Sequence, residues 1–263
     1  MAFASTPRNS TARLDPRLHT FVLVHGGMYG GWGYRCLAEV LRSRGHVVFT
    51  PTLTGYGDRS HLGTSFPIET FVADVANVLV YEDLHDVVLV GHSQAGILLP
   101  LVAKAVTERL AAIVWLAGVV LADGERRIDE DAADMSVATR AARAERDRGA
   151  PIERVRELFL DSVLHDGTPE QRAWVLERLG ASSDAIRSEP SRLSEFLALG
   201  LPTGYVHATD DRSLSLDLQR RFVGRLPGCQ AVEVDAGHSL MITAPEATSV
   251  ALERLATNLK TTS

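Results

Sequence analysis

Six short apolar runs alternate with longer amphipathic segments along the chain. The runs are rich in β-branched residues and span 20–24, 47–49, 87–90, 112–116, 204–208 and 231–234. Continuous apolar runs of this length are typical of strands buried on both faces of a parallel sheet. We expect this for the first four runs. The last two are more mixed in polarity, and we expect them nearer an edge of the sheet.

The segments between these runs carry apolar residues at the spacing of an amphipathic helix. They span 31–44, 67–81, 95–110, 214–226 and 245–259. Pro67 and Pro245 stand where proline begins a helix well, because the first helical N–H has no partner inside the helix. The alternation of strands and helices predicts an α/β fold with a doubly wound, mostly parallel sheet.

The segment 123–200 interrupts this alternation, because it contains no convincing strand and is dense in charge. We expect a flexible N-terminal tail over 1–18, a core formed by 19–122 and 201–263, and a helical cap over 123–200. An ordinary run of surface helices would give the same secondary structure. A cap is favoured because the insertion follows the carboxyl end of a strand, where the sites of open α/β sheets lie.

Composition and charge narrow the class of protein. Of 263 residues, 45% are hydrophobic and 23% charged, which is typical of a globular chain. Lys and Arg number 27 against 33 Asp and Glu, so the basic surface that nucleic-acid phosphates require is missing. The longest apolar run, 111–122, is shorter than the roughly 20 residues that span a bilayer. The N-terminus has no apolar stretch of a secretory signal, so we expect a cytoplasmic protein.

The clearest chemical motif is the segment 91–96, which reads Gly-His-Ser-Gln-Ala-Gly. It follows the apolar run 87–90 and precedes a helical segment. A serine between a strand and a helix is typical of a nucleophile elbow, where a sharp turn lifts the hydroxyl above the sheet. Ser93 is therefore the candidate nucleophile. Ala95 stands where the pattern has glycine, so we expect a slightly displaced elbow.

A serine nucleophile needs a base, and His238 is the candidate. It lies in a Gly-His loop between the last predicted strand and the last helix, after the serine in chain order. The acid that orients the base is expected between the two, in the loop after 204–208, where Asp210 and Asp211 are adjacent. Neighbouring side chains in an extended segment point to opposite sides, so only one of the two faces His238. The other is a solvated turn residue or a helix cap.

An oxyanion hole needs two backbone N–H groups. The glycine turn after the first strand supplies one, from Gly27 or its neighbour, and the amide of Gln94 supplies the other.

Cys36 and Cys229 are far apart, and no cluster of His, Cys and carboxylates has the spacing of metal ligands. The sequence therefore predicts neither a disulfide nor a metal site.

Together these motifs resemble the α/β-hydrolase superfamily over nearly the whole chain, from Phe21 to Leu255. The resemblance is closest to small bacterial esterases and to the plant methyl-esterase and hydroxynitrile-lyase group. The matching segments, in chain order, are 21–27, 31–32, 51–59, 88–93, 116–118, 123–125, 209–211 and 237–241. The resemblance implies a Ser–His–Asp triad, no cofactor, and a helical cap over the pocket.

The resemblance also separates the two aspartates. The related group reads Thr, any residue, Asp, then a basic residue, which fits Thr209 to Arg212 with Asp211 as the acid and Asp210 as the free position. Gln94 departs from the relatives, where an apolar residue is usual, so its side chain either alters the acyl pocket or turns aside. Hydroxynitrile lyases of the group look to carry Lys beside the catalytic His, and Ser239 in that place counts against a lyase.

We therefore expect a serine hydrolase of carboxylesterase type, with Ser93 attacking the ester, His238 taking its proton and Asp211 orienting His238. The amides of Gly27 and Gln94 hold the oxyanion.

The alternatives are a lactonase, a natural-product tailoring hydrolase, a non-hydrolytic lyase or a ligand-binding protein on the same fold. The expected partner is a small-molecule ester or lactone, not nucleic acid or membrane, and the sequence leaves a homodimer open. The cap aromatics Phe159, Trp174 and Phe196 are expected in the cap core.

Overall fold

The computed structural model describes residues 18–129 and 137–261, and the predicted flexible tail over 1–18 lies outside them except for its last residue. Six strands form one sheet in the order β2-β1-β3-β4-β5-β6, and all neighbouring strands are parallel. The predicted α/β class with a parallel sheet is confirmed. The strands are β1 (Thr20–Val24), β2 (Val47–Phe49), β3 (Val87–His92), β4 (Leu110–Leu116), β5 (Thr203–Ala208) and β6 (Gln230–Val234).

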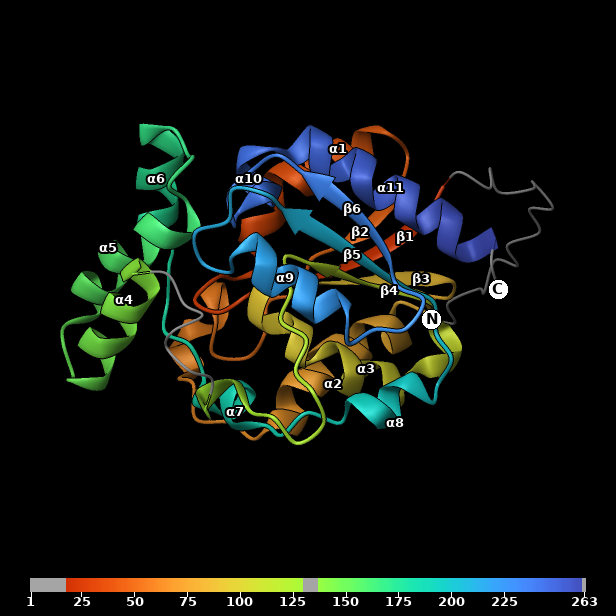
Figure 1. Ribbon diagram of the computed structural model, residues 1–263, viewed down its shortest axis with the longest axis horizontal. Coiled ribbons are helices and arrows are strands. Elements are labelled where there is room, and N and C mark those ends of the chain that lie inside the picture. The colour runs from red at the N-terminus through yellow and green to blue at the C-terminus, as the bar shows by residue number, and fades with distance from the viewer. Residues whose placement is uncertain (1–17, 130–136, 262–263) are drawn as a thin grey trace, which may run out of the picture.

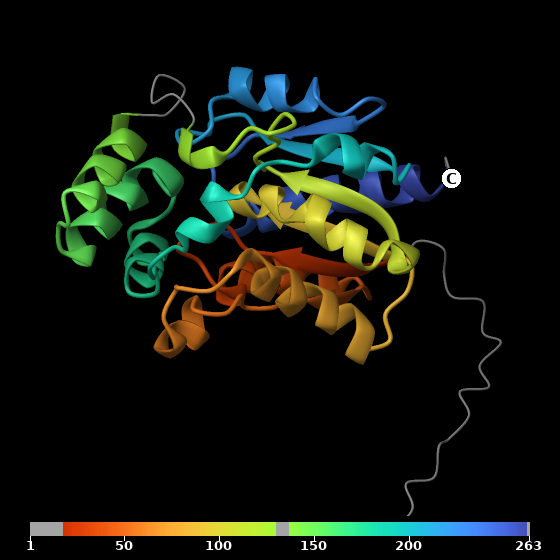
Figure 2. The same ribbon diagram turned by 90° about the horizontal axis from the view of Figure 1, so that it is seen from below.

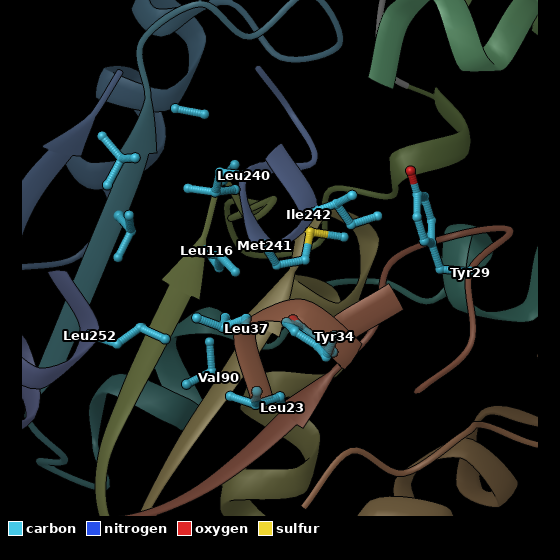
Figure 3. Close-up of a cluster of buried hydrophobic side chains, with 14 of the residues drawn as sticks. Leu23, Tyr29, Tyr34, Leu37, Val90, Leu116, Leu240, Met241, Ile242 and Leu252 are labelled. Atoms are coloured by element: carbon cyan, nitrogen blue, oxygen red, sulfur yellow. The ribbon is translucent and has the colours of Figure 1, made fainter. Parts of the chain in front are cut away.

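Helices cover both faces of the sheet (Figure 1). One face carries α1 (Arg35–Ser43), α10 (Leu240–Thr243) and α11 (Pro245–Thr261), and the other carries α2 (Ile68–Tyr81), α3 (Leu99–Ala105) and α9 (Leu216–Val223). Successive strand residues point to opposite faces. Leu23 therefore packs with Leu37 and Leu252 in the first cluster (Figure 3), whereas Val24 packs with Phe71 in the second.

One prediction about strand burial is wrong: β2 is expected to be buried on both faces but forms one edge of the sheet, with Val47 49% exposed. β5 lies next to the edge strand, in keeping with the expectation, yet it is buried at all six residues, because β4 and β6 flank it and α11 covers Gly204. The expectation for β6, the other edge strand, is correct.

The predicted helix over 95–110 is divided. It begins as a 3₁₀ turn, Ser93–Ile97, continues as α3, and ends in a second 3₁₀ turn, Thr107–Arg109. Its first turn is tight because Gly96 lies against the backbone of the segment after β4, where an added Cβ would come within 2.4 Å of the Val119 carbonyl oxygen.

Between β4 and β5 the described residues contain helices and no strand. They are α4 (Val137–Asp147), α5 (Ile152–Val163), α6 (Pro169–Leu176), α7 (Asp184–Ser188) and α8 (Leu193–Leu197). The first three stand apart beyond the carboxyl ends of the strands, whereas α7 and α8 return along the core (Figures 1 and 2). In the part of the chain described, no helix is both long enough and apolar enough to cross a bilayer.

Candidate active site

The elbow that carries Ser93 is tight and strained. Ser93 directly follows β3 and has a φ of 53°, a conformation that non-glycine residues rarely adopt and that clusters at functional sites. An added Cβ at Gly91 would lie 2.8 Å from the Leu99 side chain, so the strand and the helix require glycine there. Ala95 is buried among apolar residues of the second cluster.

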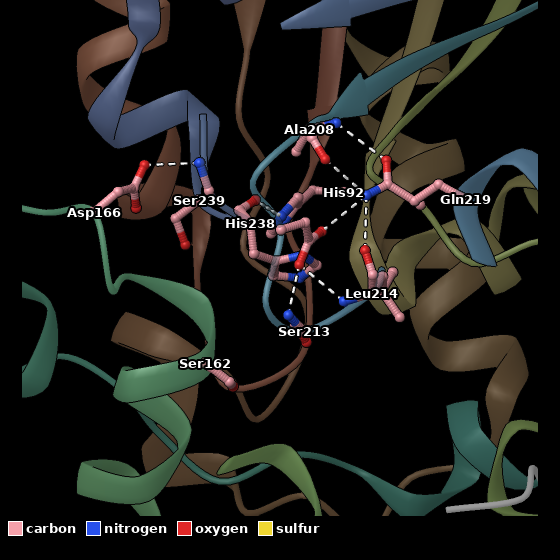
Figure 4. Close-up of polar contacts among 12 residues, drawn as sticks. His92, Ser162, Asp166, Ala208, Ser213, Leu214, Gln219, His238 and Ser239 are labelled. Atoms are coloured by element: carbon pink, nitrogen blue, oxygen red, sulfur yellow. Dashed lines mark hydrogen bonds and ion pairs between the residues drawn. The ribbon is translucent and has the colours of Figure 1, made fainter. Parts of the chain in front are cut away.

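His238 lies in the loop between β6 and α10 and is almost completely buried. Its Nδ1 atom is 2.6 Å from Oδ2 of Asp211, and the two side chains are 1% and 0% exposed (Figure 4). Asp211 follows β5, so the carboxyl ends of three parallel strands bring Ser93, Asp211 and His238 to one edge of the sheet. This is the edge at which open α/β sheets form their sites.

The buried carboxylate of Asp211 is supported by several donors. Its Oδ1 atom accepts hydrogen bonds from the main-chain N–H groups of Ser213 at 2.6 Å and Leu214 at 2.8 Å. The Gln219 side chain donates to Oδ2 at 3.3 Å. Hydrogen bonds to a charged acceptor offset the cost of burying it. Asp211 is therefore held in one orientation, with Oδ2 directed at His238.

The neighbouring aspartate points elsewhere. The Asp210 side chain is 61% exposed, and its Oδ2 atom lies 2.9 Å from Nε2 of His165 in the insertion. Of the two candidates for the acid, the structure thus places only Asp211 against His238. Asp210 is the exposed turn residue that the sequence predicts as one of two alternatives, and it also forms a contact between the core and the insertion.

His92, which sequence analysis assigned no role, contacts the loop of His238. Its Nε2 atom donates to the main-chain oxygen of His238 at 2.9 Å, and the two rings are 4.7 Å apart between centroids. Burial, aided by the nearby His238, holds the pKa of His92 well below its usual value. His92 is therefore a neutral donor that links the nucleophile elbow to the loop of the base.

His25 plays a similar part in the glycine turn after β1. It donates from Nδ1 to the Gly26 carbonyl oxygen at 2.9 Å and accepts at Nε2 from the Leu53 N–H at 3.1 Å. Burial lowers the pKa of His25 to about 4. The ring is therefore neutral, carries its proton on Nδ1, and ties the turn to the loop after β2.

This turn lies directly against the elbow. An added Cβ at Gly26 would be 3.0 Å from Cβ of Ser93, and one at Gly27 would be 2.5 Å from Oε1 of Gln94. The Gln94 side chain is turned toward Gly27 and accepts a hydrogen bond from the Ser182 hydroxyl at 3.2 Å. Gly27 and Gln94 thus lie beside Ser93, where the sequence predicts the oxyanion hole.

A cavity of about 340 Å³ opens at Ser93, lined also by Gly27 and Gln94. Its walls come from the core and from the insertion, and they are mainly apolar. The apolar lining side chains are Met28, Val119, Ala142, Ile152, Val155, Phe159, Ala181 and Leu214, and the charged ones are Arg127, Arg146 and Arg187. The volume and lining suit a small organic molecule with an apolar body.

The three cap aromatics differ in their surroundings. Phe159 lines the cavity, contrary to the expectation that it belongs to the cap core, because its helix α5 borders the cavity. Trp174 packs edge-on against Trp32 with centroids 5.2 Å apart. Phe196 packs against Trp115 of β4 at 5.6 Å. These two stabilise the contact between the insertion and the core.

The position after the base is occupied by Ser239, which is fully buried. Its hydroxyl lies 2.7 Å from the Tyr29 hydroxyl, and burial raises the pKa of Tyr29 far above its usual value, so Tyr29 remains protonated. This pair of neutral hydroxyls therefore lies directly beside the base. Across 18–129 and 137–261, no group of three or more His, Cys, Asp or Glu residues could hold a metal ion.

Comparison with known proteins identifies the family of the chain. The model of the Alpha/beta hydrolase family matches residues 21–251. A carbendazim hydrolyzing esterase of Nocardioides sp. (strain SG-4G) is 33% identical over 235 residues, 86% of this chain and 94% of its own. A pyrethroid hydrolase of Sphingobium wenxiniae is 26% identical over 239 residues, 86% of this chain and 83% of its own.

Solved structures share the fold. An extracellular alpha/beta-hydrolase from a Paenibacillus species, described as similar to tobacco salicylic acid binding protein 2, superposes with a TM-score of 0.76 at 22% identity, covering 90% of this chain and 98% of that one. A pyrethroid hydrolase superposes with a TM-score of 0.73 at 23% identity, covering 91% and 98%. The chain belongs to the Alpha/beta hydrolase family and is an enzyme of carboxylesterase type.

Proposed function

We propose that this enzyme cleaves carboxylic esters through an acyl-enzyme formed on Ser93, with His238 as the base and Asp211 as the acid that orients it. The contact of 2.6 Å between His238 Nδ1 and Asp211 Oδ2 carries the proposal. A carboxylate on Nδ1 holds the imidazole as the tautomer whose Nε2 can accept a proton. The strained elbow at Ser93 and the adjacent cavity supply the other half of the site.

The reaction has two stages. In the first, Ser93 Oγ attacks the ester carbonyl while His238 Nε2 takes the hydroxyl proton, and the amides of Gly27 and Gln94 stabilise the oxyanion. His238 then gives its proton to the departing alcohol, which leaves the acyl group on Ser93. In the second stage His238 takes a proton from water, the hydroxide attacks the acyl group, and the carboxylic acid is released as Ser93 regains its proton.

The cavity favours a compact ester with an apolar body, because its volume is about 340 Å³ and apolar side chains form a large part of its lining. Carbendazim and a pyrethroid are the first compounds to test, because two relatives that match most of this chain are named for hydrolysing them. A panel of simple p-nitrophenyl esters of increasing acyl length measures how the cavity selects its substrate.

The acyl-enzyme is tested by pre-steady-state release of p-nitrophenol from p-nitrophenyl acetate. We expect a burst of about one equivalent per enzyme from the wild type, because the alcohol leaves before the acyl group. The burst should persist in Ser182→Ala, since Ser182 is another serine on the cavity wall, and should vanish in Ser93→Ala. A burst that survives Ser93→Ala would overturn the assignment of the nucleophile.

A further inference from the structure

The end of helix α5 contacts the loop that carries His238. The main-chain N–H of Ser239 donates to the carbonyl oxygen of Val163 at 3.1 Å. On the other side of His238, the N–H of Gly237 donates to Oδ2 of Asp166 at 2.7 Å (Figure 4). The two amides that flank the base are therefore both bound by residues of the insertion.

The carboxylate of Asp166 lies very close to this loop. An added Cβ at Gly237 would be 2.5 Å from Asp166 Oδ1, so this approach requires glycine beside the base. The same Oδ2 atom accepts from the Thr243 hydroxyl at 2.8 Å, at the end of α10. Asp166 thus bridges the two ends of the short segment that contains His238.

The residue before Asp166 contacts the loop of the acid. His165 Nε2 lies 2.9 Å from Asp210 Oδ2, and its side chain is 8% exposed. Asp210 directly precedes Asp211, which contacts His238. A stretch of four residues, 163–166, therefore contacts both loops that carry the His238–Asp211 pair, although it belongs to the insertion and not to the sheet.

We propose that Asp166 is a positioning residue, whose carboxylate fixes the Gly237 amide and thereby holds the His238 imidazole in register with Ser93. This proposal rests on the function proposed above. Glycine gives the backbone beside the base unusual freedom, and a charged acceptor on its amide removes that freedom. Because a displacement of about 1 Å at a reacting group can cost up to about 10²-fold in rate, a single contact of this kind is large enough to measure.

The proposal places part of the catalytic machinery in the insertion. The insertion then has two roles, since residues of α4 and α5 line the cavity and Asp166, just after α5, orders the loop of the base. Loss of the Asp166 contact should slow the chemical step and leave binding in the cavity unchanged, because Asp166 is not among the residues that line it.

The test is the rate at which a fluorophosphonate labels Ser93, which requires no knowledge of the natural substrate. Its saturation kinetics separate the maximal labelling rate from the half-saturating concentration, and the final extent of labelling counts the correctly folded sites. For Asp166→Ala we expect a maximal rate about tenfold lower, with the half-saturating concentration within about threefold of the wild type. Asp166→Asn should keep most of the rate, because its carboxamide oxygen can still accept from Gly237.

Two controls separate positioning from general stability. Asp161→Ala removes a carboxylate at the end of α5, near Asp166 in sequence but 61% exposed and paired with Arg172, and should label at the wild-type rate. Thr243→Val removes the second donor to Asp166 and should also stay within about twofold, because the Gly237 contact remains. If Asp166→Ala does not fold, Asp166→Ser replaces it, since its hydroxyl is one bond too short to reach the amide.

The outcomes distinguish this proposal from the one on which it rests. A wild type that is labelled on Ser93, with Asp166→Ala or Asp166→Ser equally fast, overturns the role of Asp166 and leaves the proposed function intact. A change confined to the half-saturating concentration, or an equal loss in Asp166→Asn, also overturns it. A wild type that is not labelled on Ser93 overturns the proposed function and this inference together.

Discussion

His92 Nε2 donates to the main-chain oxygen of His238 at 2.9 Å, from the residue directly before the candidate nucleophile. The contact joins the carboxyl end of β3 to the loop after β6, which are separated in the sheet by β4 and β5. With the Gly237 and Ser239 amides bound by residues between β4 and β5, the loop of the base is held both by the sheet core and by the insertion.

Replacing His92 should slow the reaction and destabilise the fold. His92→Leu leaves the buried carbonyl of His238 without its donor, which costs about 1–3 kcal/mol of unfolding free energy. We expect kcat on p-nitrophenyl acetate to fall at least about tenfold, with His92→Gln intermediate because its amide can still donate. Urea unfolding and steady-state kinetics measure both effects. A His92→Leu enzyme with wild-type kcat would mean that this contact does not position the base.

The buried His25 should make stability depend on pH. Its pKa is about 4 in the folded protein, against an ordinary value of 6.5, so between these values the unfolded chain binds more protons than the native one. The contribution of the neutral His25 to the free energy of unfolding is therefore complete above about pH 6.5 and is lost as the pH falls toward 4. The largest expected loss of unfolding free energy from this residue is about 3 kcal/mol.

This pH dependence is measured by urea unfolding at pH 7 and pH 4.5. The difference in unfolding free energy between the two pH values should shrink in His25→Gln, which cannot titrate. It should persist in His85→Gln, because the His85 side chain is 58% exposed. An unchanged difference in His25→Gln would show that His25 is not the group that is protonated.

Relieving the backbone strain at position 93 should raise the free energy of unfolding. Because φ is 53° at this residue, glycine fits the turn without the steric cost that any Cβ carries there. The free energy of unfolding of Ser93→Gly should therefore be about 1 kcal/mol higher than that of Ser93→Ala, and both variants should be inactive. Comparing the two inactive variants removes the loss of the hydroxyl from the comparison. Equal stability would indicate that the elbow relaxes around residue 93.

Gly27 and Gln94 should be energetically coupled. An alanine at 27 would place its Cβ 2.5 Å from Gln94 Oε1, and the Ser182 hydroxyl donates to that atom. Gly27→Ala should thus cost about 1 kcal/mol by overpacking, and the cost should largely disappear in a Gln94→Ala background. A double-mutant cycle of unfolding free energies measures the coupling. Additive changes would mean that the Gln94 side chain moves aside freely.

Local patterns predicted the strands that end at the site. Each of the three site segments can be recognised from a few adjacent residues, because turn chemistry is local. These segments are the run before Ser93, the loop of Asp210 and Asp211, and the loop of His238. Choosing between the two aspartates needed the family resemblance. The structure separates them by their partners, His165 for Asp210 and His238 for Asp211.

The remaining features depend on contacts between distant segments. Asp166 and Gly237 are 71 positions apart, and His92 and the carbonyl of His238 are 146 apart, so no spacing rule marks either pair. The order of the strands in the sheet likewise cannot be inferred from the hydrophobic pattern of the sequence. Thr203–Ala208 looks mixed because Gly204 and His207 interrupt it, yet neighbouring strands bury it completely.

The most direct test of the triad compares two adjacent carboxylates in one loop. Asp211→Asn removes the group that holds the His238 tautomer and should lower kcat on p-nitrophenyl acetate by about 10⁴. Asp210→Asn alters only the contact with His165 and should lower it less than about tenfold. The assignment of Asp211 as the acid would be contradicted if Asp210→Asn had the larger loss of kcat, or if both variants kept the wild-type kcat.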